Sequence, residues 1–245
     1  MRSLFRSFER FEVAYLLISG QAAILYGAAT FSEDIDIWIR PTPENATRLT
    51  QALAACRARV YKLTPPITRR NLMTGHGFHF VVPTRGTPAY LDVMGRPPRV
   101  GSFSSARHRA RIMRTPWGRL PVVSILDLIA LKRTRRLSDY EVISSLVRIR
   151  LTEETPPSTA LLRWALVNSF RVEDRIDFAR QLGIRAPAEA WRRRILTEIA
   201  RHQALDTAYW RRVIRDLRRL RRQKRLLLEG MPVSRSLNPA PQLNA

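Results

Sequence analysis

Two aspartates separated by one residue are the clearest candidates for chemistry in this sequence. Asp34 and Asp36 lie in the run Asp-Ile-Asp-Ile-Trp-Ile (34–39), where polar and apolar residues alternate with the two-residue period of a β-strand. Both carboxylates therefore lie on one face of the strand, about 7 Å apart at the backbone. Oxygen ligands of this kind suit hard divalent cations, so the pair could bind one or two Mg²⁺ ions. A strand that buries its isoleucines and exposes its aspartates would show the same alternation without binding a metal. The neighbouring segments of the sequence are therefore needed to distinguish the two interpretations.

A tight turn precedes this strand and offers a place for a phosphate. The run 13–19 is mostly apolar and reads as a strand, and the run 22–29 reads as a short helix. Between them lie Ser19, Gly20 and Gln21, with thirteen residues separating Gly20 from Asp34. Backbone N–H groups at such a strand-to-helix turn can bind a phosphate, and glycine lets the ligand approach the backbone closely.

Taken together, these segments show a family resemblance. Over residues 10–150 the chain resembles the nucleotidyltransferase superfamily that shares its fold with DNA polymerase beta, and in particular small bacterial members related to abortive-infection toxins. The resemblance is carried by the runs Ile-Ser-Gly-Gln-Ala (18–22), Tyr-Gly-Ala (26–28) and Asp-Ile-Asp (34–36). The family signature is a Gly-Gly or Gly-Ser turn followed by an acid-apolar-acid strand. Here Ser19 replaces the usual first glycine and the larger Gln21 follows Gly20, so the phosphate-binding turn is altered.

The resemblance implies roles for further residues. Asp92, in Tyr-Leu-Asp-Val (90–93), matches the third carboxylate of the family, a second metal ligand and general base, so the implied catalytic and metal-binding set is Asp34, Asp36 and Asp92. The turn residues would bind the triphosphate of a nucleoside triphosphate donor. Lys132 matches a basic position that approaches the triphosphate, although a lysine at a helix end can equally be solvated. The implied reaction moves a nucleotide to an acceptor hydroxyl or phosphate.

Two other pairs have structural interpretations. Arg136 and Asp139 lie where related sequences have a basic and then an acidic residue, and we interpret them as a structural salt link. His76 and His79 are three residues apart near the site, but they have no cysteine partner. We therefore expect a turn residue and a strand residue rather than zinc ligands.

The charge of the chain points to a polyanionic partner. The 245 residues include 43 Lys+Arg against 20 Asp+Glu, a formal net charge of +23. Such a charge attracts RNA, so tRNA or another RNA is the favoured acceptor, although an arginine-rich codon bias would give the same composition. The C-terminal third carries arginine clusters near every turn of its helices, with Trp191 and Trp210 available for base stacking or core packing.

Two alternatives to this function stay open. The first is a non-catalytic RNA-binding or toxin–antitoxin interaction protein that keeps the fold, with a cognate antitoxin as partner. The second is an antibiotic-modifying nucleotidyltransferase, which should show an acidic acceptor pocket. The single Cys56 forms no disulfide within the chain, and no run approaches 18 apolar residues, so we expect a cytoplasmic protein without a membrane span.

The remaining patterns predict an α+β fold, with a nucleotidyltransferase-like mixed sheet flanked by helices and a C-terminal all-helical region. We expect a domain over 1–151, a linker over 152–158, a basic helical domain over 157–229 and a disordered tail over 231–245. Other expected elements are a helix 44–55 capped by Thr42, a hairpin of strands 78–82 and 89–94, a loop 95–115, a strand 120–123, a helix from Ser124 with an Asp127 capping box, a helix 140–150 capped by Asp139, and helices 157–168, 172–182 and 187–228, the last broken at Asp206.

Overall fold

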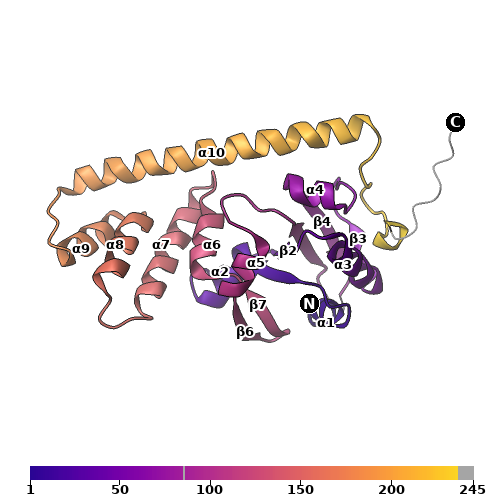
Figure 1. Cartoon of the computed structure of the whole chain (residues 1–245), viewed down its shortest axis with the longest axis horizontal. Coiled ribbons are helices and arrows are strands. Elements are labelled where there is room, and N and C mark those ends of the chain that lie inside the picture. The colour runs from indigo at the N-terminus through magenta and orange to yellow at the C-terminus, as the bar shows by residue number, and fades with distance from the viewer. Residues whose placement is uncertain (85, 237–245) are drawn as a thin grey trace.

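The computed structural model describes residues 1–84 and 86–236, and it has the α+β fold expected from the sequence (Figure 1). A mixed seven-stranded sheet has the order β3-β4-β5-β2-β1-β7-β6. Its strands are β1 (Tyr15–Ile18), β2 (Asp34–Ile39), β3 (Arg59–Val60), β4 (Gly77–Val82), β5 (Ala89–Met94), β6 (Arg111–Thr115) and β7 (Gly118–Val122). The helices are α1 (Arg2–Arg10), α2 (Ser19–Tyr26), α3 (Pro43–Ala55), α4 (Arg69–Thr74), α5 (Phe103–Arg109), α6 (Ile125–Lys132), α7 (Ser138–Leu151), α8 (Thr159–Asn168), α9 (Val172–Gln181) and α10 (Ala188–Arg222).

The central strand β2 has the bounds predicted for it. It pairs antiparallel with β1 and parallel with β5. Ile35 and Ile37 are buried on the core face, while Asp34 and Asp36 lie half-buried on the other face, as the alternation predicts. The hairpin prediction is also confirmed, because β4 and β5 pair antiparallel along their whole length.

Side-chain caps fix the starts of two helices that flank the sheet. At α3, the Thr42 hydroxyl accepts a hydrogen bond from the Asn45 backbone N–H at 3.3 Å. At α6, the Ser124 hydroxyl accepts from the Asp127 N–H at 3.2 Å and donates to the Asp127 carboxylate at 2.8 Å. Both caps were predicted, and both satisfy N–H groups that have no partner within the helix.

The loop predicted over 95–115 is wrong in its second half. Ser102 caps the short helix α5, and Phe103 packs edge-on against Trp38 with 5.7 Å between ring centroids. The following residues form β6, which pairs antiparallel with β7 at the edge of the sheet. Most side chains of β6 are exposed, so this edge strand lacks the apolar run by which a strand is recognised.

Two aspartates predicted as helix caps have other roles. Asp139 lies inside the first turn of α7, where its carboxylate binds neighbouring basic and hydroxyl groups. Asp206 does not break the last helix: α10 continues through it, and Asp206 is buried there with a side-chain exposure of 2%. Asp139 is stabilised there by ion pairs with nearby residues, including the predicted link to Arg136, whereas Asp206 pairs with the distant Arg99, which sequence alone does not show.

The predicted disordered tail is wrong for residues 231–236. The Val60 N–H donates to the Met231 carbonyl at 2.9 Å, and the Val233 N–H donates to the Ala58 carbonyl at 3.0 Å. Val233 is buried against α3, which covers apolar surface at this edge of the sheet. The rest of that prediction, residues 237–245, lies outside the described residues.

The C-terminal helices pack onto the sheet region through a shared core. α7 ends at Leu151 and α8 begins at Thr159, as a linker over 152–158 predicts, yet one hydrophobic cluster includes residues from both sides of it, among them Val147 and Leu162. α10 then runs lengthwise along one side of the molecule, from the region of α9 past α7 and α6 to α4 (Figure 1). Within the described ranges, no helix combines the length and the apolar character that a membrane span requires.

Candidate functional site

Three predicted site residues meet on two neighbouring strands. The register of β2 and β5 places Asp36 directly opposite Asp92 and Asp34 opposite Tyr90. Side chains of directly opposite residues project from the same face of a sheet, so all three carboxylates lie on the polar face of these strands. The sequence placed Asp34 and Asp36 together, and the strand pairing adds Asp92.

The same row of the sheet contains a histidine that touches the site. His79 on β4 lies opposite Asp92, and its Nδ1 is 2.7 Å from Asp92 Oδ1. His79 is a strand residue, as interpreted from the sequence, but its contact with a predicted catalytic residue was missed. The alternation of Phe78, His79 and Phe80 contained the signal, because it turns the imidazole away from the apolar face.

The carboxylates perturb one another's ionisation. Burial, and then the nearby charge of Asp92, raise the pKa of Asp36 from 3.8 to about 7, while a hydrogen bond from Ser19 opposes this rise. Partial burial and Asp92 also raise the pKa of Asp34, against the charges of Lys62 and His79. The site is therefore a cluster of like charges in a partly desolvated place.

The donor set of this cluster fits a hard cation. Asp34, Asp36 and Asp92 offer only carboxylate oxygens, the ligands that Mg²⁺ prefers. In the described part of the chain, no three His, Cys, Asp or Glu side chains already stand in an arrangement that could hold a metal ion. Binding would thus require the carboxylates to rotate towards one another, and the magnesium site stays a prediction.

The turn predicted at Ser19, Gly20 and Gln21 is wrong in one respect, because these residues form the first turn of α2, which begins at Ser19 and ends at Tyr26 rather than running over 22–29. Ser19 begins α2 with a φ of 58°, in the left-handed region, and lines the same pocket as Asp36. Gly20 lies so close to Ser32 that a Cβ added to it would be 2.2 Å from Ser32 Oγ. The buried amide of Gln21 donates to the Ser32 carbonyl at 3.1 Å, so Gln21 anchors the loop before β2 and does not present its amide to a ligand.

A half-open pocket of about 250 Å³ begins at this turn. Ser19 and Asp36 form one wall, and the loop between α6 and α7 forms another. The volume lies just below the roughly 300–1,000 Å³ of drug-sized sites, so it suits a phosphate chain better than a whole nucleotide. The complete lining consists of Ile18, Ser19, Asp36, Met94, Pro97, Pro98, Arg99, Leu131, Lys132, Thr134, Arg135, Arg136, Asp206 and Trp210.

Lys132 lines this pocket but is committed to an ion pair. Its Nζ is 2.8 Å from Asp139 Oδ1, and both side chains are less than a tenth exposed. Although burial opposes ionisation of Asp139, the pairing with Lys132 holds its pKa below the ordinary value. Arg136 shares the same carboxylate at 3.1 Å, as predicted, while its side chain remains two-thirds exposed. Arg136 is therefore better placed than Lys132 to meet an incoming phosphate.

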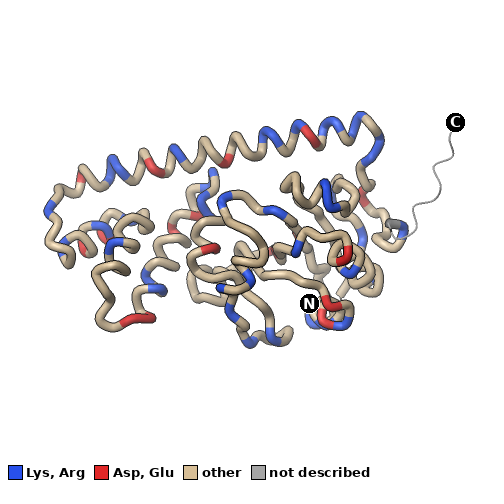
Figure 2. Tube along the Cα trace, in the orientation of Figure 1, with Lys and Arg blue, Asp and Glu red and all other residues tan. Residues whose placement is uncertain are grey.

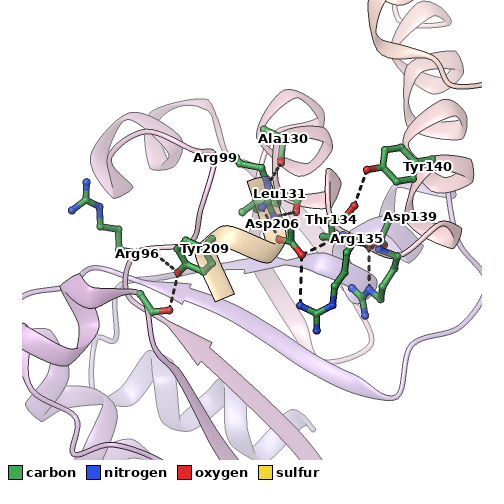
Figure 3. Close-up of polar contacts among 12 residues, drawn as sticks. Arg96, Arg99, Ala130, Leu131, Thr134, Arg135, Asp139, Tyr140, Asp206 and Tyr209 are labelled. Carbon is green, nitrogen blue, oxygen red and sulfur yellow. Dashed lines mark hydrogen bonds and ion pairs between the residues drawn. The ribbon is translucent and has the colours of Figure 1, made fainter. Parts of the chain in front are cut away.

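The far wall of the pocket is α10, which sequence reasoning did not connect with the site. Asp206 binds the Arg99 guanidinium at 2.7 Å and accepts from the Arg135 backbone N–H at 3.2 Å (Figure 3). Arg99 also donates to the carbonyls of Ala130 and Leu131, which lie at the C-terminal end of α6 and need partners there.

Three further contacts hold α10 over the sheet. Gln203 donates to the Arg135 carbonyl, Tyr209 donates to the Gly75 carbonyl at 2.8 Å, and His76 Nε2 lies 2.8 Å from Asp216. Positions 203, 206, 209, 213, 216 and 220 recur every three or four residues, so they form one face of the helix. The sequence analysis predicted none of these polar anchors.

The close approach of Gly20 to Ser32 leads to a first expected result. Gly20→Ala should lower the free energy of unfolding by about 1–3 kcal/mol, because the new methyl group overlaps Ser32 Oγ and Cβ. Denaturant unfolding measures this loss. Gly101→Ala is the control, since no described atom lies within 4 Å of a Cβ there. Adding Ser32→Gly to Gly20→Ala should restore stability, and equal stability of Gly20→Ala and wild type would contradict the packing.

The site thus combines three carboxylates, a hydroxyl-bearing turn and a basic pocket beside them. This arrangement can bind a cation and an anionic ligand side by side. A comparison with protein-family models finds no match, and a search of curated proteins finds no significantly similar sequence. The resemblance to nucleotidyltransferases therefore rests on the residues quoted for it and on the chemistry that their arrangement permits.

Proposed function

We propose that the chain is a Mg²⁺-dependent nucleotidyltransferase that moves a nucleotide from a nucleoside triphosphate to an acceptor hydroxyl or phosphate, with RNA as the acceptor class. The observation that carries the proposal is the pairing of Asp36 with Asp92 on adjacent strands, with Asp34 on the same face and the basic pocket beside them. A cytoplasmic location and an antitoxin partner are expectations from the sequence that belong to the same proposal.

The proposed reaction assigns one task to each part of the site. An acceptor oxygen forms a bond to the α-phosphorus of the donor, the bond from that phosphorus to the bridging oxygen breaks, and pyrophosphate leaves. The proton of an acceptor hydroxyl passes to the Asp92 carboxylate, which His79 orients. Bound Mg²⁺ would neutralise the phosphate charge. Ser19 and Arg136 would bind the phosphates from the pocket side.

A row of arginines on α10 supports RNA as the acceptor. Arg211, Arg215, Arg218 and Arg222 are spaced by four, three and four residues and are exposed on the face opposite the buried Val213. Within the described residues, none of the four makes an ion pair. Figure 2 shows basic positions recurring along α10. An unneutralised row of this kind attracts a phosphate backbone.

The arginine row predicts a salt-dependent RNA affinity. Replacing Arg211, Arg215, Arg218 and Arg222 by alanine should weaken RNA binding and reduce the slope of log K against log salt by up to about 3 on single strands. Fluorescence anisotropy across a salt series measures both quantities. As the control, Arg192→Ala removes an arginine at the other end of α10 that already pairs with Glu189. An unchanged slope in the fourfold variant would contradict an RNA-binding role for this row.

A labelling assay tests the activity itself. The protein is incubated with each α-³²P-labelled nucleoside triphosphate, Mg²⁺ and total RNA, and label in RNA is followed on gels. Wild type should transfer label, whereas the rate of transfer by Asp34→Asn should be at least about 100-fold lower. Mutating a group that only orients a metal ligand already lowers activity by about 10- to 100-fold, and the loss of a ligand itself should lower it at least as much. Glu33→Gln, next in the sequence and exposed, is the matched control. Equal transfer by wild type and Asp34→Asn, or none by either, would contradict the proposal. RNA binding without transfer would favour the non-catalytic alternative.

A further inference from the structure

Two tyrosines form an aromatic pair beside the carboxylates. Tyr90 lies directly opposite Asp34 on the neighbouring strand. Tyr61 directly follows β3, its backbone N–H donates to the His79 carbonyl, and its ring centroid is 4.5 Å from that of Tyr90. The ammonium of Lys62 lies 4.9 Å from the centre of the Tyr61 ring.

The position of this pair is not explained by core packing. β5 buries Leu91 and Val93 on its core face, whereas Tyr90 is on the polar face, with Asp92. Both tyrosines are half-buried and Lys62 is exposed. Half-exposed aromatic rings next to a cation are the usual means of binding single-stranded nucleic acid, because bases stack on the rings and the cation meets the phosphate.

The sheet order places this pair opposite the phosphate pocket. In the sequence of strands β3-β4-β5-β2-β1, the tyrosines lie on the side of β3 and β5, whereas Ser19 follows β1 on the other side. Asp36, on β2, lies between them, and Asp92 shares β5 with Tyr90. A donor triphosphate near Ser19 and a base on the tyrosines would therefore lie on different sides of Asp36, with the acceptor on the side of Asp92.

The end of α10 lies next to the same segment. After α10 the chain returns to the sheet, where Leu227 and Thr64 exchange two backbone hydrogen bonds, with the Leu227 N–H donating at 2.7 Å and the Thr64 N–H donating at 3.4 Å. Thr64 is two residues beyond Lys62, and Leu227 is five beyond Arg222. The exposed arginine row of α10 therefore leads towards Lys62 and the tyrosine pair.

We infer that Tyr61 and Tyr90 stack the terminal base of a single-stranded RNA, with Lys62 on its phosphate, and so present the terminal acceptor group to Asp92. This inference rests on the proposed function for the identity of the acceptor, but the binding itself requires no transfer. It specifies an unpaired RNA end, rather than a duplex end or a small molecule, as the acceptor.

Binding without any nucleoside triphosphate tests the inference separately from catalysis. The probe is a short single-stranded RNA with 2-aminopurine as its 3′-terminal base, whose fluorescence falls on stacking. Wild type should bind this RNA and quench the 2-aminopurine fluorescence. Tyr61→Leu should weaken binding about tenfold and abolish the quench, whereas Tyr61→Phe, which keeps the ring, should stay within about twofold of wild type. A blunt duplex with the same terminal base should show no difference between the variants.

The outcomes separate the two proposals. An equal quench by wild type and a folded Tyr61→Leu, or no binding of the single strand by wild type, would overturn the inference. Should Tyr61→Leu fail to unfold cooperatively in a melting experiment, Tyr90→Leu and its control Tyr90→Phe take its place with the same expected results. Loss of the quench in the leucine variants, with no transfer by wild type to any RNA, would sustain the base-stacking site and refute the transferase.

Discussion

Asp36→Asn is expected to make the protein more stable above pH 7 while it abolishes nucleotide transfer. Burial and the charge of Asp92 raise the folded-state pKa of Asp36 from 3.8 to about 7, so the folded state holds this proton more tightly than the unfolded chain does. Stability is therefore lost as the pH rises from about 4 to about 7. One unit of pKa corresponds to about 1.4 kcal/mol, so above pH 7 the ionised Asp36 lowers the free energy of unfolding by up to about 4 kcal/mol.

Denaturant unfolding at a series of pH values without divalent cations measures this effect. The gain in stability from Asp36→Asn should be largest above pH 7. It should vanish below pH 4, where the Asp36 carboxyl of the wild type is protonated in the folded and in the unfolded protein. Mg²⁺ should then stabilise wild type, by about 2.7 kcal/mol at one hundred times its dissociation constant, and leave Asp36→Asn unchanged. A variant less stable than wild type at every pH would contradict the like-charge cluster, and equal stabilisation of both proteins by Mg²⁺ would contradict the metal site.

Asp206→Ala is expected to lower the free energy of unfolding by about 3–5 kcal/mol, the largest loss that we expect from any single truncation. The change leaves the Arg99 guanidinium without its anionic partner in a largely buried place, and it removes the acceptor of the Arg135 N–H. Arg99 remains bonded to the end of α6, so its charge cannot easily move to solvent. The wall that α10 contributes to the pocket should loosen as well.

Urea unfolding quantifies the effect of Asp206→Ala, and hydrogen exchange of the backbone N–H groups of α10 reports the loosening. Glu189→Ala is the matched control, because it removes an acid from the same helix whose ion pair with Arg192 is mostly exposed. That control should change stability by less than about 1 kcal/mol. A similar, small change in both variants would show that the Asp206–Arg99 pair does not hold α10 to the sheet.

Local signals in the sequence predicted most of the elements around the site. The alternation at 34–39 gave β2 with its bounds, and hydroxyl caps gave the starts of α3 and α6, because these features depend on neighbours in the chain. β6 escaped prediction because it is an exposed edge strand with little apolar periodicity. Asp206 was taken for a cap because its ion-pair partner Arg99 comes from a distant part of the chain, and Asp139 because α7 begins at Ser138, two residues before the predicted start.

In the candidate site, too, the features that depend on local sequence were predicted, and those that depend on tertiary packing were not. The spacing of Asp34 and Asp36 put two carboxylates on one face, and the resemblance to nucleotidyltransferases pointed to Asp92. The ion pair of Lys132 with Asp139 depends on the fold of the short loop between α6 and α7. The contact of His79 with Asp92 and the wall formed by α10 depend on strand register and on long-range packing. Distances between residues 100 or more positions apart, such as Arg99 and Asp206, cannot be obtained from composition or spacing.

The straight course of α10 also sets a length scale. The rise of an α-helix is about 1.5 Å per residue, so the row from Arg211 to Arg222 spans about 16 Å. Successive phosphates of one strand in a stacked nucleic-acid helix are about 3.4 Å apart along the axis, which makes this row about as long as five stacked nucleotides. Because the other face of α10 is bound to Gly75 and Arg99 in loops beside the sheet, the helix would set the distance from the carboxylates at which a strand of RNA is bound.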